Sequence, residues 1–572
     1  MKHLFFGAAA IALLTACGGS DNGDVSKEIA GAGEAAVKSA ESAISDLGNI
    51  TLREGDASEA AQALAAMSLD ASGAGRIEFD DSSSDAAAAS FDSLNFSVPE
   101  EDTNFTIGQM AFDGLDMTEE GASFAKLSLS DIVIMPDEDE ETQGEIRIGG
   151  MELINPSPGL AAWIASLNGE GEPGPFPAGE DLSFDRWSLS DIDMQIEEGD
   201  EGAMNFALES IELGGVGNDE VAVAAISGIT MDGTAEGTPF NMNLGSMSLL
   251  GANRSFVDAL RNNAGDEEEM VAAMMSAAYQ NPLDPGYDSV VIDDFAFDAG
   301  GVSFALPGLN TSVERNADGQ PVKYVTQPYT MTLEADAEGG EPGSQLAAGL
   351  GMVGYESLEL SGAGVTDYDP ETDTMSFDSK SNFLKLTDGF EMRFGGKLEG
   401  YSAYAESFAG MDFEQMMSGS APDDQMMQQA ISQLKLHGFN LQLTDNSIVD
   451  RLFNLAAAQS GEDPEQLRTQ VVGMTSMAPM MAAESGIDME IVNEAVTAVQ
   501  GFLQEPGTLT LALDPEAPLS MESIAAMEDP SQLTKSYLGF SARHEELGPF
   551  QAKWAPVRVK KMREDKTLAH LH

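Results

Sequence analysis

Residues 384–401, LKLTDGFEMRFGGKLEGY, carry the pattern that decides the fold class of this chain. Leucines alternate with Lys385 up to Asp388-Gly389, a pair that can supply the positive φ angles of a tight hairpin turn. After the turn, apolar and charged residues alternate, and the apolar ones would share one face of a strand: Phe390, Met392 and Phe394. The segment therefore predicts two antiparallel strands with one buried face and one wet face.

The same kind of pattern extends to both sides of this hairpin. From about Phe91 the chain consists of short alternating runs broken by Gly, Asp and Asn, as in antiparallel sheets, and Gly395-Gly396 is expected to turn the chain again. We therefore predict an α+β protein, elongated and built mainly of antiparallel β-sheet repeats with intervening helices. Its β-rich body would span 91–400, and a helix-rich C-terminal part would follow.

Imperfect internal repeats support an elongated body. SFAKLSLSDI (123–132) recurs as SFDRWSLSDI (183–192), and MSLLGANRSFVDAL (247–260) matches FNLQLTDNSIVDRL (439–452), with MELINPSPGLAAWI (151–164) as a weaker copy. In the second pair a strand precedes a helix, and the serine at the helix start, Ser255 or Ser447, is expected to cap it. Repeated units of this kind bury their faces against their neighbours.

The remaining segments differ in composition. Residues 25–90 are typical of Ala-rich helices followed by a linker, DASGAGRIEFDDSSSDAAAAS, at 70–90. Residues 401–547 mix strands and helices and form the helix-rich part. The last segment, 548–572, contains QAKWAPVRVKKMR, with five basic side chains and no acid, and a terminal segment of this kind is expected to be disordered.

The single cysteine of the chain stands directly after an apolar run near the N-terminus. Lys2 provides a positive charge, and LFFGAAAIALL (4–14) is too short to span a bilayer, as in a secretory signal peptide. The run ends in Leu14-Thr15-Ala16-Cys17, which resembles the lipobox of bacterial lipoproteins. That resemblance implies a signal peptide at 1–16 and a lipid-modified Cys17 at the start of the mature chain.

The lipoprotein resemblance also implies a location in the cell envelope. Two or more acyl chains make a stable membrane anchor, and the polar, Gly-rich residues 17–24 would form a flexible tether. Gly18 follows the cysteine, where enterobacterial lipoproteins retained at the inner membrane have aspartate. The resemblance therefore points to an outer-membrane lipoprotein that faces the periplasm.

The composition excludes one class of partner. With 97 acidic and 27 basic residues, the formal net charge is -70 at pH 7. Nucleic acid binding needs a basic footprint, so no nucleic acid partner is expected. Beyond the leader, no segment is long and apolar enough to cross a membrane, and contact with the membrane is expected through the lipid anchor alone.

In its strand patterning the chain is similar to the large β-rich envelope proteins of proteobacteria grouped around AsmA-like and YdgA-like proteins. Some of those proteins are implicated in lipid traffic and outer-membrane assembly. We expect a non-enzymatic protein that scaffolds, or that binds and transfers an apolar ligand, with a lipid or an envelope protein as its partner. Two alternatives stay open: a hydrolase that cleaves an envelope polymer with two carboxylates, and a metal- or partner-binding module.

Candidate catalytic groups are few. Outside the leader and the tail, the histidines are His437 and His544, so a His-rich zinc site or an HExxH helix is excluded. No GxSxG sequence marks a nucleophile, and the carboxylates are too numerous for one catalytic pair to be singled out. We predict no catalytic residue and no cofactor.

One acidic segment is close to a calcium-binding loop. DYDPETDTMSFD (367–378) has acids at positions 1, 3, 5, 7 and 12 of an EF-hand pattern, and the candidate ligands are Asp367, Asp369, Glu371, Asp373 and Asp378. Thr372 stands where that loop requires Gly, so a turn between strands at 369–372 is the favoured interpretation.

Methionine is abundant, at 31 residues, and several methionines recur at near-helical spacing within 467–503. We expect this segment to pack an apolar side against the sheet as the wall or lid of an apolar cleft, formed by Val471, Met474, Met477 and Met481. Unbranched, polarizable thioethers can repack around varied ligands. A closed core without a ligand is an equal alternative, and Cu(I) binding is a weaker one.

Overall fold

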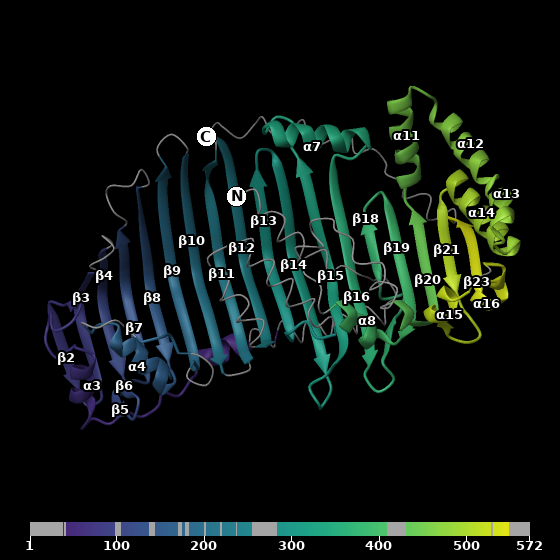
Figure 1. Ribbon diagram of the computed structural model, residues 1–572. Coiled ribbons are helices and arrows are strands. Elements are labelled where there is room, and N and C mark those ends of the chain that lie inside the picture. Colours follow the sequence, from purple (N-terminus) through teal and green to yellow (C-terminus); the bar gives the residue numbers. More distant parts are fainter. Residues whose placement is uncertain are drawn as a thin grey trace. The chain divides into compact units, whose positions relative to one another are not determined.

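Figure 1 shows the computed structural model of the chain. It describes residues 38, 42–97, 104–135, 143–169, 174–177, 182–198, 202–217, 220–235, 237–253, 283–408, 431–527 and 530–547. The predicted signal peptide, Cys17, the tether, Ser255 and the basic tail lie outside these residues. The described residues up to Ala347 belong to a first compact unit, and nearly all later ones belong to a second.

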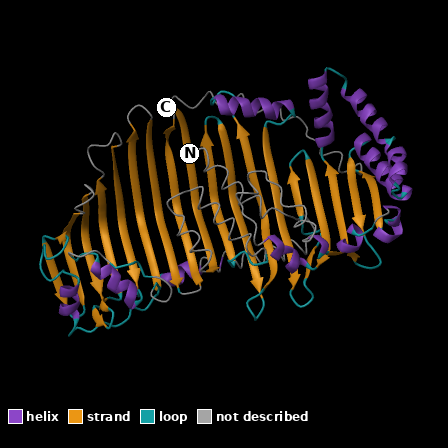
Figure 2. Ribbon diagram, in the orientation of Figure 1, coloured by secondary structure: helices purple, strands orange, loops and turns teal. Residues whose placement is uncertain are grey.

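The first unit is an antiparallel sheet in which consecutive strands lie side by side, and Figure 2 shows how strongly strands dominate it. From β3 onward each strand of the sheet pairs with the next one, while β1 and β2 both pair with β3. The strands are β1 (Ile77–Glu78), β2 (Asp81–Asp85), β3 (Ala88–Ser97), β4 (Asn104–Asp113), β7 (Lys126–Met135), β8 (Gln143–Ile154), β9 (Phe184–Glu198), β10 (Gly202–Val216), β11 (Glu220–Ala235), β12 (Thr238–Asn253), β13 (Ser289–Ala299), β14 (Val302–Arg315) and β15 (Pro321–Ala335).

A few further elements accompany this sheet. They are the helices α3 (Ala60–Ala66) and α4 (Pro158–Ser166) and a separate hairpin of β5 (Asp116–Thr118) and β6 (Gly121–Ser123). Helix α7 (Glu341–Met352) follows β15. The predicted α+β class with a mainly antiparallel sheet is thereby confirmed.

The sheet begins earlier than its composition suggests. The stretch at 70–90, expected to be a linker, contains β1, β2 and the start of β3. All five residues of β2 are exposed, and the hydroxyls of Ser83 and Ser90 lie 2.8 Å apart across the strand pair. A short polar edge strand pairs through its backbone and avoids further association, so it lacks the apolar alternation by which strands are recognised.

One face of the first unit's sheet is apolar from β3 to β15. Successive cross-strand partners form an unbroken row with one apolar residue from each strand: Phe96, Phe105, Ile134, Ile146, Met194, Phe206, Met231, Met242, Phe297, Phe304 and Leu333. We name it the Phe96–Leu333 row. Its members are half-buried, whereas strand neighbours such as Asn95, Arg147 and Asp298 are exposed on the opposite face.

A second apolar row runs parallel to the first. It consists of Phe91, Met110, Leu129, Met151, Leu189, Ile211, Ile226, Met247, Ile292 and Leu309, again one residue per strand from β3 to β14. We name it the Phe91–Leu309 row. Phe96 and Met110, one from each row, line the same cavity, so both rows belong to one face, called the apolar face below.

Between the two apolar rows lies a line of residues with left-handed backbone. Five residues on alternate strands have φ between 52° and 66°: Ser93, Asp131, Asp191, Gly228 and Asp294. Asp131 stands opposite Gly108, and the pairing there steps over one residue in each strand, from Ile107–Ile132 to Gln109–Ser130. Asp131 and Asp191 occupy the same place in the two SLSDI segments. Because the pairing steps over each left-handed residue, the apolar side chains on both sides of it point to the same face of the sheet.

The N-terminal segment contacts both faces of this sheet. Leu47, in the helical stretch 42–47, packs with Val223, Leu250 and Val291. Val223 alternates with the apolar-row residue Ile226, so this contact lies on the opposite face. Helix α3 belongs to the core on the apolar face. Arg53, between the two helices, donates hydrogen bonds to the carbonyl oxygens of Phe124 and Pro156.

The second unit is a smaller antiparallel sheet with helices. β16 pairs with β17 and β18, both of these pair with β19, and β20, β21 and β23 follow in that order, with β22 beside β20. Its elements are β16 (Ser357–Asp369), β17 (Thr374–Phe377), β18 (Phe383–Leu386), β19 (Phe390–Glu399), α8 (Tyr401–Phe408), β20 (Lys435–Asp445), α11 (Ile448–Ser460), α12 (Pro464–Thr475), α13 (Ala478–Ser485), α14 (Met489–Gln504), β21 (Gly507–Leu513), β22 (Leu519–Ser520), α15 (Met521–Ala525), a 3₁₀ turn (Pro530–Gln532), α16 (Lys535–Leu538) and β23 (Phe540–Glu546).

The hairpin predicted within 384–401 is present as β18 and β19, in which Leu386 pairs with Phe390. Asp388 supplies the positive φ, at 55°. Gly395-Gly396 does not turn the chain, because β19 continues through both glycines. A Cβ at Gly395 would lie 2.7 Å from the backbone nitrogen of Ser379, so the glycine permits a close approach. The face of Phe390, Met392 and Phe394, expected to be buried, is only half-buried.

The start of α11 also differs from the expectation. Ser447 makes no capping hydrogen bond to the helix and instead donates its hydroxyl to the carbonyl oxygen of Asp388. Asp445, which is 1% exposed, accepts from the N–H groups of Ser447 at 2.9 Å and Val449 at 3.3 Å. The carboxylate two residues earlier therefore satisfies the first backbone donors of the helix.

Candidate functional site: an apolar cavity beneath helix α4

A cavity of about 510 Å³ lies in the first unit, between α4 and the apolar face. Its floor comes from the two apolar rows and their neighbours, among them Phe96, Ile107, Met110, Leu129, Met151 and Trp187. Its roof comes from α4, through Leu160, Trp163, Ile164 and Ala165. A volume in this range is typical of small-molecule sites.

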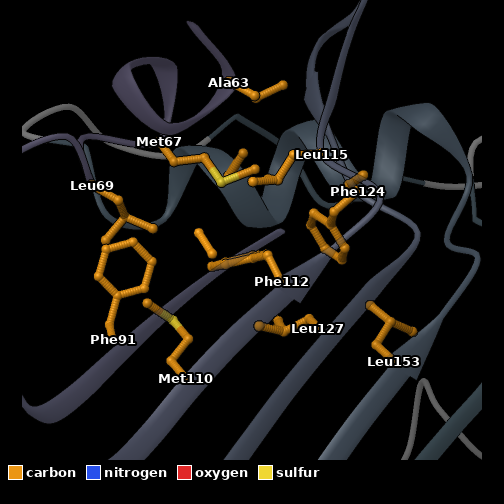
Figure 3. Packing of buried hydrophobic residues seen from close by; sticks show 14 of the residues in the cluster. Ala63, Met67, Leu69, Phe91, Met110, Phe112, Leu115, Phe124, Leu127 and Leu153 are labelled. Atoms are coloured by element: carbon orange, nitrogen blue, oxygen red, sulfur yellow. The ribbon is translucent and has the colours of Figure 1, made fainter. Parts of the chain in front are cut away.

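The walls of the cavity rest on a dense core. Figure 3 shows Ala63 of α3, and Met67 directly after this helix, above the strands that carry Phe112, Leu127 and Leu153. Ala63 is 0% and Met67 is 1% exposed, and the rings of Phe112 and Phe124 meet edge to face at 5.3 Å between centroids. Such packing holds the lining side chains in place, so the shape of the cavity is built before any ligand enters.

Asn168 belongs to the lining of the cavity near β1 and is 5% exposed. Its amide nitrogen donates to the carbonyl oxygens of Met67 at 2.9 Å and Ser68 at 3.1 Å. Its amide oxygen accepts from the N–H of Ile77 at 2.9 Å. Asn168 thereby joins the end of α4, the end of α3 and the start of β1.

An aromatic pair stands at another part of the wall. The rings of Trp163 and Phe176 meet edge to face at 4.9 Å between centroids, and the Trp163 indole N–H donates to the carbonyl oxygen of Gly174 at 3.0 Å. Phe176 is 50% exposed. The pair therefore forms the boundary between the cavity and solvent on this side.

The lining of the cavity consists almost entirely of apolar side chains. Among the lining residues, polar side-chain groups come from Asn168 and from the indoles of Trp163 and Trp187, and those of Asn168 and Trp163 have hydrogen-bond partners. No carboxylate, imidazole, hydroxyl or thiol belongs to the lining. The site can stabilise an apolar group by removing it from water, at about 25 cal/mol per Å², and it contains no acid, base or nucleophile.

The methionine-rich helices do not pack against the sheet as expected. Met474, Met477 and Met481 are 70%, 52% and 67% exposed, and Val471 is 37% exposed. Residues 467–485 lie on α12 and α13, which contact α14. It is α14 that contacts β21 and β23, with Ala498 and Phe502 buried. The contact with the sheet that was expected of the methionines is thus made by α14. Helices α12 and α13 contact α14 instead of the strands.

The acidic segment 367–378 forms a turn, as favoured over a calcium loop. Asp369 ends β16 and accepts from the Thr372 hydroxyl at 2.7 Å, while Asp373 accepts from the Ser402 hydroxyl at 2.7 Å. The hydrogen bond from the Thr372 hydroxyl and then the one from the Glu371 N–H lower the pKa of the Asp369 carboxyl. Within the described residues, no three or more His, Cys, Asp or Glu side chains gather as a possible metal site. The five candidate ligands are therefore not brought together.

The two body histidines lie in strands of the second unit. His437 Nε2 is 2.9 Å from a carboxylate oxygen of Glu399. The pKa of that carboxyl is lowered, first by the hydrogen bond from Lys435 and then by the one from His437. His544 lies between α14 and β21, where a Cβ at Gly501 or Gly507 would approach its ring within 3 Å. Both histidines serve packing and pairing within the sheet.

The residues of the cavity were missed by the sequence reasoning. Trp163 and Trp187 lie in segments recognised only as parts of imperfect repeats, 151–164 and 183–192. The sequence signal for the cavity residues is that apolar residues occupy paired positions in successive strands. That signal becomes visible only once the register of the strands is known, because it lies between strands and not within one.

Comparisons with known proteins are sparse. A family model described as "Uncharacterized protein" matches residues 383–545, which include β19, β20 and the helices α11 to α14. No curated protein matches this chain. A search of the described helices for a stretch sufficiently long and apolar to span a bilayer gives no candidate.

Proposed function

We propose that this protein is a non-enzymatic, lipid-anchored envelope protein that binds the hydrocarbon part of a lipid-like ligand on the apolar face of its first unit. The observation that carries the proposal is the continuity of that face. Two apolar rows cross the sheet from β3 to β14 or β15, and at one end they form the floor of an apolar cavity.

The exposure of the face supports a binding role. Beyond the cavity, large side chains such as Phe206, Met231 and Phe297 are half-buried rather than covered completely. Contiguous apolar patches larger than a few hundred Å² are rare on monomers and mark binding sites. A ligand laid across these strands would remove the remaining apolar area from water, at about 25 cal/mol per Å². The force is non-directional, so the face suits chains that slide or are transferred.

The sequence supports the location. The lipobox-like Leu14-Thr15-Ala16-Cys17 would provide an anchor in the outer membrane, with Gly18 after the cysteine. The strongly acidic body, at -70, would be repelled by anionic lipid headgroups and stand away from the membrane surface. In this proposal the body is an elongated series of repeated strand units, in which the two SLSDI segments mark equivalent strands.

Native mass spectrometry of the full chain, purified from bacterial membranes, tests the proposed function. We expect a bound lipophilic molecule that is lost in the double variant Met231→Gln/Phe297→Gln. The matched control, Asn205→Gln/Asn241→Gln, changes exposed residues in neighbouring positions on the opposite face. A wild-type protein that carries no lipophile and shows no saturable binding of a fluorescent fatty acid would contradict the proposal.

The anchor is tested separately. In Cys17→Ala, the precursor should stay uncut or the protein should move to the soluble fraction, because the thiol that carries the lipid is missing. Membrane association and processing equal to the wild type would contradict a lipid anchor at Cys17. That result would leave the ligand proposal standing, since the apolar face does not depend on the anchor.

A further inference from the structure

We infer that the cavity beneath α4 receives a single unbranched acyl chain, with its methyl end towards Asn168 and its entry at the β9–β10 side. This inference rests on the proposed function, since it specifies the ligand and its direction on the apolar face. It is inferred from the extent of the cavity lining, the hydrogen bonds of Asn168 at one end, and the way in which the other end joins the rest of the apolar face.

The cavity is long for its volume. Its lining extends from Ile77 on β1 to Leu213 on β10. Seven neighbouring strands, separated by six spacings, contribute to it. At about 4.7–4.9 Å between neighbouring strands, these spacings extend over roughly 28 Å. One acyl chain takes up half of the roughly 30 Å hydrocarbon core of a bilayer, so a single chain fits within this length. A volume of about 510 Å³ distributed along this length forms a trough, and a linear chain fits a trough better than a compact ring system.

The end at Asn168 is suited to a methyl group. The donors and acceptors of this amide are used by Met67, Ser68 and Ile77. A headgroup pushed to this end would lose its water without gaining a hydrogen bond, which is unfavourable for every polar group that it carries. The headgroup must therefore stay on the β9–β10 side of the seated chain, and the chain must enter with its methyl group first.

The end at β9 and β10 continues into the open face. Leu213 and Phe184 line the cavity and also pack against the next apolar cluster, formed by Val216, Val221, Leu249 and Ala252. Cross-strand pairing runs from Trp187 to Leu213 and on to Ala224. A chain can thus pass from the face into the cavity without crossing a polar residue.

Two tryptophans make this direction measurable. Trp187 lies on β9 near the entry, and Trp163 lies on α4, five residues before Asn168. The third tryptophan, Trp554, is in the C-terminal tail. The full-length variants Trp187→Phe/Trp554→Phe and Trp163→Phe/Trp554→Phe each retain one reporter. Bromine on an acyl chain quenches indole fluorescence on contact, so bromine position reports where each part of the chain lies.

The experiment titrates both reporters with fatty acids brominated near the methyl end or near the carboxyl end. We expect methyl-end bromine to quench Trp163 at least twofold more than Trp187, and carboxyl-end bromine to show the reverse order. The reverse of both orders would overturn the direction, and equal quenching of both tryptophans by both acids would overturn the seated chain. Vesicles of brominated phosphatidylcholine form a second arm and show whether the chain comes from a free acid or from a phospholipid.

Plugging the cavity provides the control. Ala165→Leu and Ile164→Phe add volume to the roof and should abolish quenching at Trp163, while Ala207→Leu adds the same side chain on the opposite face of β10 and should not. Circular dichroism checks each fold, and two plugs guard against misfolding of one. If native mass spectrometry finds a lipophile but bromine quenches neither reporter, the inference fails and the proposed function stands. If neither method detects binding, both fail.

Discussion

Ile107 and Met110 line the same cavity although they are three residues apart in β4. In a regular strand, residues three apart point to opposite faces. Here Gly108 stands opposite Asp131, whose φ is 52°, and the strand pairing steps over both residues. Repeated on alternate strands, this step lets the apolar face continue across the line of left-handed residues. The continuity of the candidate site therefore depends on a backbone feature.

The first prediction concerns this contact. A Cβ at Gly108 would lie 2.8 Å from the Cβ of Asp131, so Gly108→Val should lower the free energy of unfolding of the first unit by about 1–3 kcal/mol. Urea unfolding followed by tryptophan fluorescence measures it, since Trp163 and Trp187 lie in this unit.

The control for Gly108→Val removes the opposing atom. Asp131→Gly alone should change stability little, because Gly adopts φ > 0 without strain. Gly108→Val should recover at least half of its lost stability when it is combined with Asp131→Gly. Additive effects in this double-mutant cycle would mean that the two residues do not clash.

The second prediction concerns Arg53, which connects the N-terminal segment to the sheet. Arg53→Ala removes the donor to the carbonyl oxygens of Phe124 and Pro156. Hydrogen bonds to charged groups contribute about 1.5–3 kcal/mol, so amide hydrogen exchange in α3 should accelerate by at least about tenfold. Exchange in β12, which is distant in the sheet order, serves as the internal control. An equal acceleration in both elements would indicate global destabilisation instead of local opening.

The third prediction separates the two residues at the start of α11. Asp445→Ala should cost about 1–2 kcal/mol, because the N–H groups of Ser447 and Val449 lose their acceptor. Asp445→Asn should cost less than half as much, since its amide oxygen can still accept. Ser447→Ala should cost less than Asp445→Ala, and chemical denaturation of the full chain compares the three. A larger loss of stability in Ser447→Ala than in Asp445→Ala would indicate that Ser447 caps the helix.

The fourth prediction concerns the alkaline titration of Tyr368. Burial, and then the hydrogen bond that its hydroxyl donates to Asp373 at 3.0 Å, raise the pKa of Tyr368 to about 12. The raised pKa favours the neutral phenol in the folded state, so its contribution to stability is complete below about pH 10, the ordinary tyrosine pKa, and is lost as pH rises towards 12. The difference in absorbance at about 295 nm between wild type and Tyr368→Phe should titrate above pH 11, and in Asp373→Asn at a lower pH. A midpoint near 10 in both proteins would contradict the assignment.

The sequence predicted an antiparallel sheet correctly, but it predicted less well where individual strands begin and end. The alternation around Asp388-Gly389 predicted a hairpin that the structure confirms, because a positive φ and a period of two are local properties. The composition of the Ser- and Asp-rich β2 predicts a linker, because an edge strand is held by its partner's backbone and not by its own side chains. Gly395-Gly396 was taken for a turn, although a close approach to Ser379 gives these glycines a place inside a strand.

The apolar cavity does not lie where the sequence places an apolar cleft. The sequence predicts an apolar cleft beside a one-sided sheet and assigns its wall to Val471, Met474, Met477 and Met481, which recur at near-helical spacing. Such spacing shows that residues share a helix face but not what that face contacts, and Met474 is 70% exposed. The cavity arises instead from Trp163, Trp187 and Asn168, which are brought together from a helix, a strand and a loop.

What the sequence by itself determined is local: alternating strands, Asp and Gly at turns, a strongly acidic surface, and a single cysteine in a lipobox-like context. These follow from one stretch of chain, since backbone preference and side-chain period act over a few residues. Only the tertiary structure decided that apolar residues from β3 to β15 align into rows and that α4 roofs one end of them. Register sets both, because a shift of one residue would turn an entire strand's apolar side chains to the other face.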